Sequence, residues 1–99
     1  MHKKDILSYL KELNKELKEK YGINKLGIYG SYARDEAGKN SDVDIFYERD
    51  SSISVSGFDL LRIPETIEKD LHIKVDFVDL KYMNPIVKYY AKKEFIYVY

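Results

Sequence analysis

Two short apolar runs joined by a compact polar segment constrain the fold of this chain more than any other feature. The first run, residues 26–29, ends in a Gly-Ser pair, and the second opens with Asp-Val-Asp at residues 42–44. Ten residues separate the Gly-Ser pair from the acidic triplet. Short apolar runs bounded by turn residues are typical of strands. The pattern therefore predicts two strands linked by one short polar excursion.

The acidic triplet favours a cation site. Asp42 and Asp44 are two positions apart, so on a strand both carboxylates project from the same face, about 6–7 Å apart along the backbone. Two such carboxylates repel each other unless a cation lies between them, and Mg²⁺ suits oxygen ligands. Gly30 and Ser31 form a turn whose exposed N–H groups suit phosphate. A metal next to a phosphate site indicates nucleotidyl transfer.

A third carboxylate comes from the segment KVDFVD at residues 74–79, whose alternation predicts a third strand. Asp76 lies on the face opposite Val75 and Phe77, amid apolar neighbours, where a buried or half-buried carboxylate needs a partner. If this strand is next to that of the acidic pair, three carboxylates converge. That is the usual way to hold two divalent ions about 3.5–4 Å apart for displacement at phosphorus. Asp79 is the competing third ligand, but it shares the face of Val75 and Phe77, so Asp76 is preferred.

Each of these patterns also has an ordinary structural interpretation. An isolated Asp-x-Asp is often a solvated strand end, and glycine before a serine N-cap is common at the start of helices. Arg34, one helical turn after the Gly-Ser pair, either reaches a phosphate oxygen or pairs with Asp35 or Glu36. Ser41 flanks the connecting loop and is either a nucleotide contact or simply solvated.

The remaining pattern predicts one α/β (α+β) domain over residues 1–99, with a small mixed β-sheet, flanking helices and the order αβαβαβα. Pro64 either kinks the second long helix or starts a new one, and residues 95–99 form an edge strand or a packed tail. The first helix is stopped by Gly22. Helices are expected at 3–20, 58–71 and 85–93, a helical turn capped by Ser31 at 31–36, and strands at 25–30, 42–47 and 74–79.

Composition argues against several classes of protein. The 17 basic and 17 acidic residues leave no surplus for binding nucleic acid or an anionic membrane. The absence of cysteine rules out disulfides and fits the cytoplasm. The charged N-terminus is not a signal peptide, and no apolar run is long enough to span a membrane. Tyrosines cluster near the C-terminus, where they form a partner surface or close the core: Tyr89, Tyr90, Tyr97 and Tyr99.

Gly-Ser, ten residues, Asp-x-Asp and a later strand Asp together resemble the nucleotidyltransferase signature of the DNA polymerase beta superfamily. The segments GSYARDEA (30–37), SDVDI (41–45) and KVDFV (74–78) are similar to minimal nucleotidyltransferases, the MNT or MntA-like antitoxins. Asn84-Pro85 and the ending at 94–99 fit as well. The resemblance covers nearly the whole chain.

The resemblance implies an antitoxin that transfers AMP from ATP to a tyrosine of a partner HEPN-domain ribonuclease, releasing pyrophosphate. It implies that Asp42 and Asp44 bind two Mg²⁺ ions and orient the triphosphate. It also implies that Asp76 completes the second ion site and helps to deprotonate the attacking hydroxyl, and that Gly30 and Ser31 hold the β- and γ-phosphates. The predicted nucleotide-binding set is Gly30, Ser31, Arg34 and Ser41.

The chain departs from the family pattern at Asp35, where relatives commonly carry glycine. A carboxylate beside a phosphate site repels a nucleotide, but no required carboxylate is missing, so activity is expected. Two alternatives stay open. One is an antitoxin that blocks its toxin by binding alone, and the other is an enzyme that adenylylates a small molecule such as an aminoglycoside.

Overall fold

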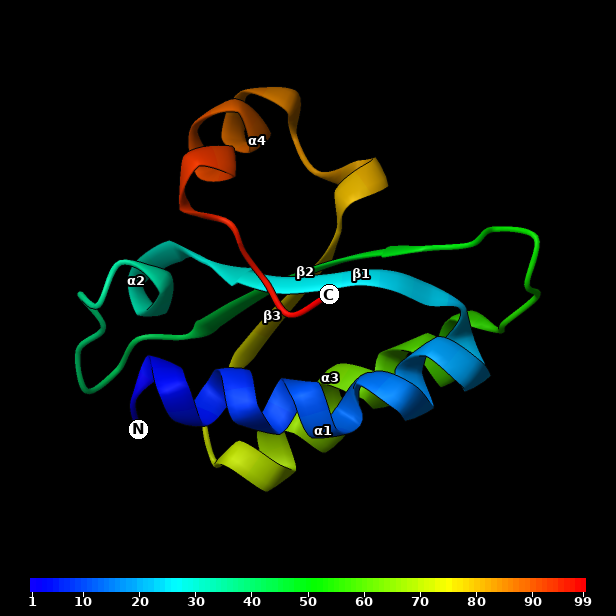
Figure 1. Ribbon diagram of the computed structural model, residues 1–99, viewed down its shortest axis with the longest axis horizontal. Helices are drawn as coiled ribbons and strands as arrows, with labels where there is room; N and C mark the ends of the chain where they lie inside the picture. Colours follow the sequence, from blue (N-terminus) through cyan, green and yellow to red (C-terminus); the bar gives the residue numbers. More distant parts are fainter.

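A four-stranded mixed sheet organises the computed structural model, which describes residues 1–99 (Figure 1). The strand order is β3-β2-β1-β4, with β1 antiparallel to both β2 and β4, and β2 parallel to β3. This arrangement confirms the predicted mixed sheet with flanking helices. In chain order the elements are α1 (Lys3–Tyr21), β1 (Ile23–Tyr29), α2 (Gly30–Ala33), β2 (Val43–Arg49), α3 (Gly57–Leu71), β3 (Val75–Asp79), η1 (Leu80–Tyr82), α4 (Pro85–Ala91), η2 (Lys92–Glu94) and β4 (Ile96–Tyr97).

The two long helices, α1 and α3, cover one face of the sheet (Figure 1). Their apolar residues recur at helical spacing, so each helix buries one stripe against the strands. The chain leaves α1 at Gly22, whose φ of 69° is the left-handed conformation that glycine adopts readily. The residues that the two helices contribute to the core are Ile6, Leu10, Leu17, Ile63, Ile67 and Leu71.

The structure decides two alternatives that the sequence left open and shortens one predicted helix. Pro64 lies inside one uninterrupted helix, so the alternative in which it starts a new helix is wrong. Ile96 and Tyr97 pair with β1, which confirms the C-terminal edge strand. The predicted helix at 85–93 is too long, because its last turn tightens into the 3₁₀ helix η2.

The opposite face of the sheet is covered only by the C-terminal part of the chain, with η1 and α4 on the other side of the sheet from α1 and α3 (Figure 1). Phe46 of β2 is fully buried there. The ring of Phe95 stacks on it at 4.2 Å between centroids, and Leu80 and Met83 complete a small apolar cluster. This cluster buries Phe46, whereas Asp44, two residues earlier on β2, stays partly exposed.

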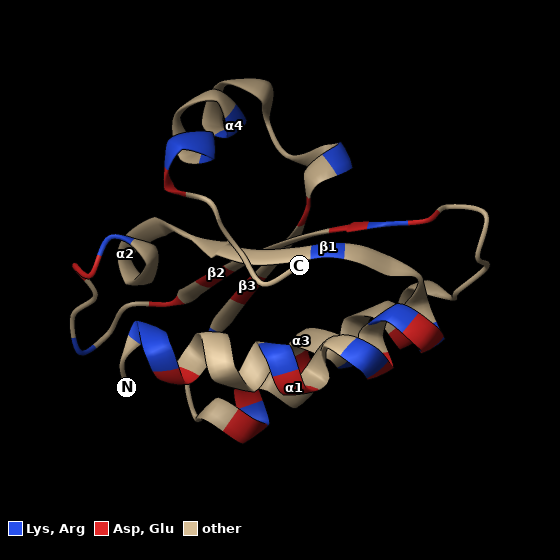
Figure 2. Ribbon diagram, in the orientation of Figure 1, with Lys and Arg blue, Asp and Glu red and all other residues tan.

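Charged residues of both signs alternate along the outer sides of α1 and α3 (Figure 2). None of the helices combines the length and the apolar character needed to cross a bilayer.

Candidate active site

The site is built on the face of the sheet that carries the C-terminal cluster. Val43 and Ile45 of β2 belong to the core beneath α1 and α3, whereas Phe46 belongs to the opposite cluster. Because side chains alternate along a strand, Asp44 shares the face of Phe46. In the parallel pairing, Asp44 lies directly opposite Asp76. The sequence left open whether the strands of these two residues are neighbours, and the parallel pairing shows that they are.

The other two carboxylates of the predicted site, Asp42 and Asp76, are exposed. Asp42 is exposed and lies one residue before β2 begins. The expected burial of Asp76 is wrong, because β3 is an edge strand and the residue is exposed. Asp79 accepts a hydrogen bond from the Lys81 N–H at 2.9 Å and caps η1, which leaves Asp76 as the third carboxylate on the site face.

The electrostatics of the three carboxylates suit a cation, although no three His, Asp or Glu side chains are already arranged around a common metal position. Burial, followed by the negative charges of Asp76 and Asp42, raises the pKa of Asp44 to about 6. A divalent cation relieves this repulsion, and carboxylate oxygens are ligands that Mg²⁺ accepts. The donor set therefore fits Mg²⁺, and the assignment of Asp42, Asp44 and Asp76 as ligands stays a prediction.

The Gly-Ser turn lies against Asp44. Tyr29, the last residue of β1, pairs with Asp44 on β2, so α2 starts beside that carboxylate. Gly30 has a φ of 75°, and a Cβ added there would lie 2.1 Å from Oδ2 of Asp44. Only glycine fits both requirements. The prediction that Ser31 caps this turn is wrong: Tyr29 holds the N-cap position without a side-chain hydrogen bond, and Ser31 lies within the turn.

One hollow, of about 530 Å³, lies between the end of β1, the start of β2 and the C-terminal segment. The predicted site residues that line it are Gly30, Ser31, Arg34 and Asp44. Its other lining residues are Tyr29, Ile86, Val87, Tyr90, Ala91 and Glu94. A larger hollow, of about 660 Å³, lies at the other end of β2 and contains none of the predicted site residues.

Ser41 does not line the hollow that contains Gly30, Arg34 and Asp44. Its Oγ accepts a hydrogen bond from the Gly38 N–H at 2.8 Å, which closes the loop before β2. Ser41 and Asp42 line a different hollow, of about 360 Å³. The structure thus gives Ser41 a role in the loop, and its contact with a nucleotide stays a prediction.

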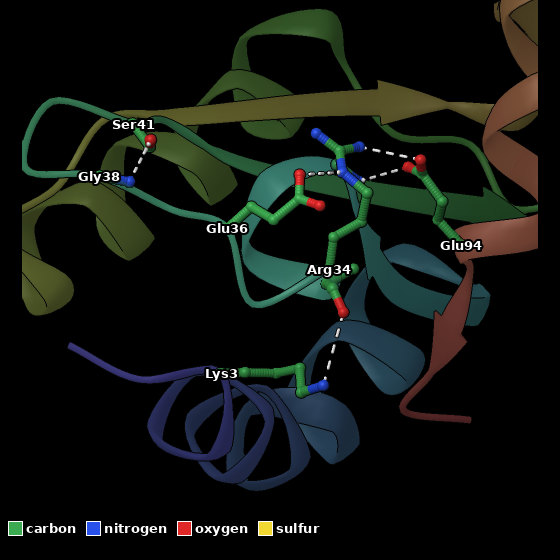
Figure 3. Close-up of polar contacts among 8 residues, drawn as sticks. Lys3, Arg34, Glu36, Gly38, Ser41 and Glu94 are labelled. Carbon is green, nitrogen blue, oxygen red and sulfur yellow. Dashed lines mark hydrogen bonds and ion pairs between the residues drawn. The ribbon is translucent and has the colours of Figure 1, made fainter.

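Arg34 is paired with two carboxylates. Its Nε lies 3.1 Å from Oε2 of Glu36, one of the partners the sequence allowed, and its Nη1 lies 2.8 Å from Oε1 of Glu94 (Figure 3). Asp35 instead pairs with Lys3 of α1 at 2.9 Å. Its φ of 58° is the left-handed conformation that favours glycine, and its partner offsets part of the charge expected to repel a nucleotide.

Glu94 is the site residue that the sequence did not single out. Besides its contact with Arg34, its Oε2 accepts a hydrogen bond from the Gly30 N–H at 3.2 Å. It follows α4 in the chain, and no spacing pattern links it to the Gly-Ser turn. Its only signal was its place in the ending that resembles the minimal nucleotidyltransferases.

The C-terminal tyrosines divide between the surface and the core. Tyr89, Tyr90 and Tyr97 are exposed, whereas the hydroxyl of Tyr99 donates to the Ile23 carbonyl at 3.2 Å and its ring packs on the core. Of the two tyrosines on the central strands, Tyr47 is buried in the core, whereas Tyr29 is half-buried and lines the hollow of the site.

Comparison with known proteins identifies the family. The family model described as a nucleotidyltransferase domain matches residues 10–98. The chain belongs to the nucleotidyltransferase family. A candidate protein adenylyltransferase from Methanocaldococcus jannaschii, MJ1379, is 38% identical over 95% of each chain. The protein adenylyltransferase MntA from Thermococcus cleftensis is 33% identical over 95% of this chain and 93% of its own. The protein is thus a nucleotidyltransferase enzyme with MntA-like relatives.

Solved structures share the same fold. A candidate minimal nucleotidyltransferase superposes with a TM-score of 0.76 at 25% identity, covering 97% of this chain and 95% of its own. A toxin–antitoxin structure with AMP-PNP gives a TM-score of 0.71 at 18% identity, over 89% and 70% of the two chains. The complex of an MNT antitoxin with the tri-AMPylated HEPN toxin of Shewanella oneidensis gives 0.70 at 13% identity, over 98% and 71%. The last two likenesses establish the fold alone.

Proposed function

We propose that this nucleotidyltransferase is an antitoxin that transfers AMP from ATP to a tyrosine of a HEPN-domain toxin. The single observation that carries the proposal is the register of β2 and β3, which sets Asp44 opposite Asp76 and beside the Gly30 turn. The identity to MntA over nearly the whole chain supports the same chemistry. The related complexes that contain a HEPN toxin or AMP-PNP support the choice of partner and of ATP.

In the proposed reaction, the phenol oxygen of the acceptor tyrosine attacks the α-phosphorus of ATP. The bond between that phosphorus and the bridging oxygen breaks, AMP becomes attached to the phenol, and pyrophosphate leaves. Asp76, which is exposed on the edge strand, takes the phenolic proton in this proposal. The Gly30 N–H and the guanidinium of Arg34 are donors for the phosphate oxygens.

Asp42, Asp44 and Asp76 are the residues that would hold Mg²⁺. When bound, the ions would offset negative charge that develops on the attacking and leaving oxygens. Burial and the acidic neighbours raise the pKa of Asp44 to about 6. The group is therefore ionised at neutral pH, and a cation between the carboxylates would relieve the repulsion.

The proposal is tested with the full chain, a purified HEPN partner and radiolabelled ATP. We expect Asp44→Asn to reduce labelling of the toxin by at least about 100-fold, because loss of a transition-state charge partner costs several kcal/mol. Glu65→Gln is the matched control, since Glu65 is an exposed carboxylate of α3 and lies outside the site. Full labelling by the Asp42→Asn/Asp44→Asn double variant would rule out this mechanism.

Exposed apolar side chains on α4 support a second candidate, an antitoxin that acts by binding alone. Ile86, Tyr89 and Tyr90 are each at least 66% exposed, and Ile86 and Tyr90 border the hollow of the site. Titration separates the two candidates. A catalytic antitoxin silences its toxin well below one equivalent when ATP is present, whereas a binding antitoxin needs one equivalent and tolerates Asp44→Asn.

A further inference from the structure

Glu94 already occupies the donors that a triphosphate would need. One of its carboxylate oxygens accepts from the Gly30 N–H at 3.2 Å, and the other contacts Nη1 of Arg34 at 2.8 Å. Figure 3 shows the Arg34 guanidinium held between Glu94 and Glu36. A carboxylate that bridges a backbone N–H and a guanidinium makes the same contacts as a pair of phosphate oxygens.

We propose that Glu94 is a built-in competitor for the nucleotide, a carboxylate that fills the phosphate-binding donors until the triphosphate displaces it. This inference rests on the proposed function, because it takes the Gly30 turn as the phosphate site. It adds to that function an autoinhibitory contact between the C-terminal segment and the turn.

The neighbouring negative charges mean that Glu94 keeps its contacts with Gly30 and Arg34 only while no nucleotide is bound. Glu94 brings a further negative charge to the hollow that Asp44 also lines. A triphosphate entering the hollow adds more negative charge, so Glu94 and the nucleotide are not compatible at the same donors. Arg34 remains paired with Glu36, so losing Glu94 leaves it oriented.

The packing around Glu94 allows its side chain to leave without unfolding the segment. The next residue, Phe95, is anchored by stacking on Phe46 at 4.2 Å and by an edge contact with Tyr29 at 5.8 Å. The Glu94 side chain itself is 27% exposed and borders the open hollow. Displacement therefore requires a rotation of one side chain rather than a movement of α4.

The test measures binding of AMP-PNP with Mg²⁺ to the full chain by calorimetry. Glu94→Gln keeps the shape of the side chain and removes its charge, so we expect the Kd to fall by about 5- to 10-fold, the effect of losing a charged competitor. Glu94→Asp keeps the charge but is too short to bridge both donors, and we expect a smaller fall in Kd. Glu36→Gln is the matched control: it also removes a carboxylate from Arg34 but leaves the Gly30 contact intact, so we expect less than about a 2-fold change.

Two results would overturn the inference while leaving the proposed function standing. One is unchanged or weaker binding by Glu94→Gln, together with AMP transfer by the wild-type chain. The other is an equal gain in affinity in Glu94→Gln and Glu36→Gln. In the first case, slower AMP transfer by Glu94→Gln than by the wild type would assign Glu94 to positioning Arg34. If neither the wild type nor any variant binds AMP-PNP or transfers AMP, both the inference and the function fail. Thermal unfolding of each variant checks that it is folded.

Discussion

At the scale of single residues, the charge state of Asp44 links the site to stability. Its pKa is raised from 3.8 to about 6 by burial and by its acidic neighbours. At pH values between these two pKa values, the folded protein therefore keeps a proton on Asp44 that the unfolded chain has released. Above about pH 6, the ionised Asp44 makes its whole unfavourable contribution to the stability of the metal-free protein. This contribution disappears as the pH falls toward about 4.

The first prediction follows from that sign. Asp44→Asn should stabilise the metal-free protein by about 1 kcal/mol at about pH 8, a value reduced because solvent screens this half-exposed group. At about pH 4.5 the gain should be much smaller. Thermal unfolding followed by circular dichroism at both pH values measures the difference, with Glu65→Gln as the control. An equal gain at both pH values would contradict the assignment.

Gly30 carries the second prediction. Alanine there would hold a φ of 75° and place its Cβ 2.1 Å from Oδ2 of Asp44, so we expect a loss of about 1–3 kcal/mol in stability and a loss of nucleotide binding. Gly38→Ala is the matched control, because a Cβ there meets only Oγ of Ser41 at 3.9 Å. Denaturant unfolding and AMP-PNP titration of both variants give the comparison, and equal behaviour of the two would argue against a strained turn.

At the scale of elements, β3 is the weak part of the site because it is an edge strand with β2 as its only neighbour in the sheet. Its inner face is held by Phe77, whose ring stacks on Tyr47 at 4.3 Å between centroids. The backbone pairing that places Asp76 opposite Asp44 depends on this anchor.

The third prediction is that Phe77→Ala lowers AMP transfer although Phe77 lies on the face away from the site. We expect a loss of about 2 kcal/mol in stability from the removed aromatic contact and faster hydrogen exchange in β3. Phe58→Ala tests the same change at a ring that is 82% exposed and should have an effect below about 0.5 kcal/mol. Normal transfer by a destabilised Phe77→Ala variant would show that Asp76 does not need a fixed β3.

At the scale of the whole molecule, the two faces of the sheet have different tasks. The face under α1 and α3 buries most of the core, while the other face carries the carboxylates, the Gly-Ser turn and the short C-terminal cover. Since both faces share the same four strands, we expect them to unfold together.

The fourth prediction is a single cooperative transition. Far-ultraviolet circular dichroism and tyrosine fluorescence should report the same midpoint in urea, with a slope of about 1–3 kcal/mol/M. Separate midpoints would mean that the C-terminal segment, residues 80–99, unfolds on its own and would contradict a single folding unit.

The sequence by itself determined the local elements and the faces of the strands, because helical and strand periods are short-range properties of the chain. It placed Asp42 and Asp44 on one face of a strand, and it assigned Asp76 and Asp79 to opposite faces of another. It could not show how far the edge position of β3 exposes Asp76, or that Tyr29 rather than Ser31 precedes the first turn of α2.

The tertiary structure alone decided which segments meet. The parallel register that pairs Asp44 with Asp76 depends on how the sheet assembles, and Glu94 reaches Gly30 across 64 positions of the chain. Such contacts depend on the summed packing of both faces of the sheet rather than on any local pattern. The sequence therefore predicted the carboxylates and the turn. Only the fold showed that the Glu94 carboxylate contacts the turn at Gly30.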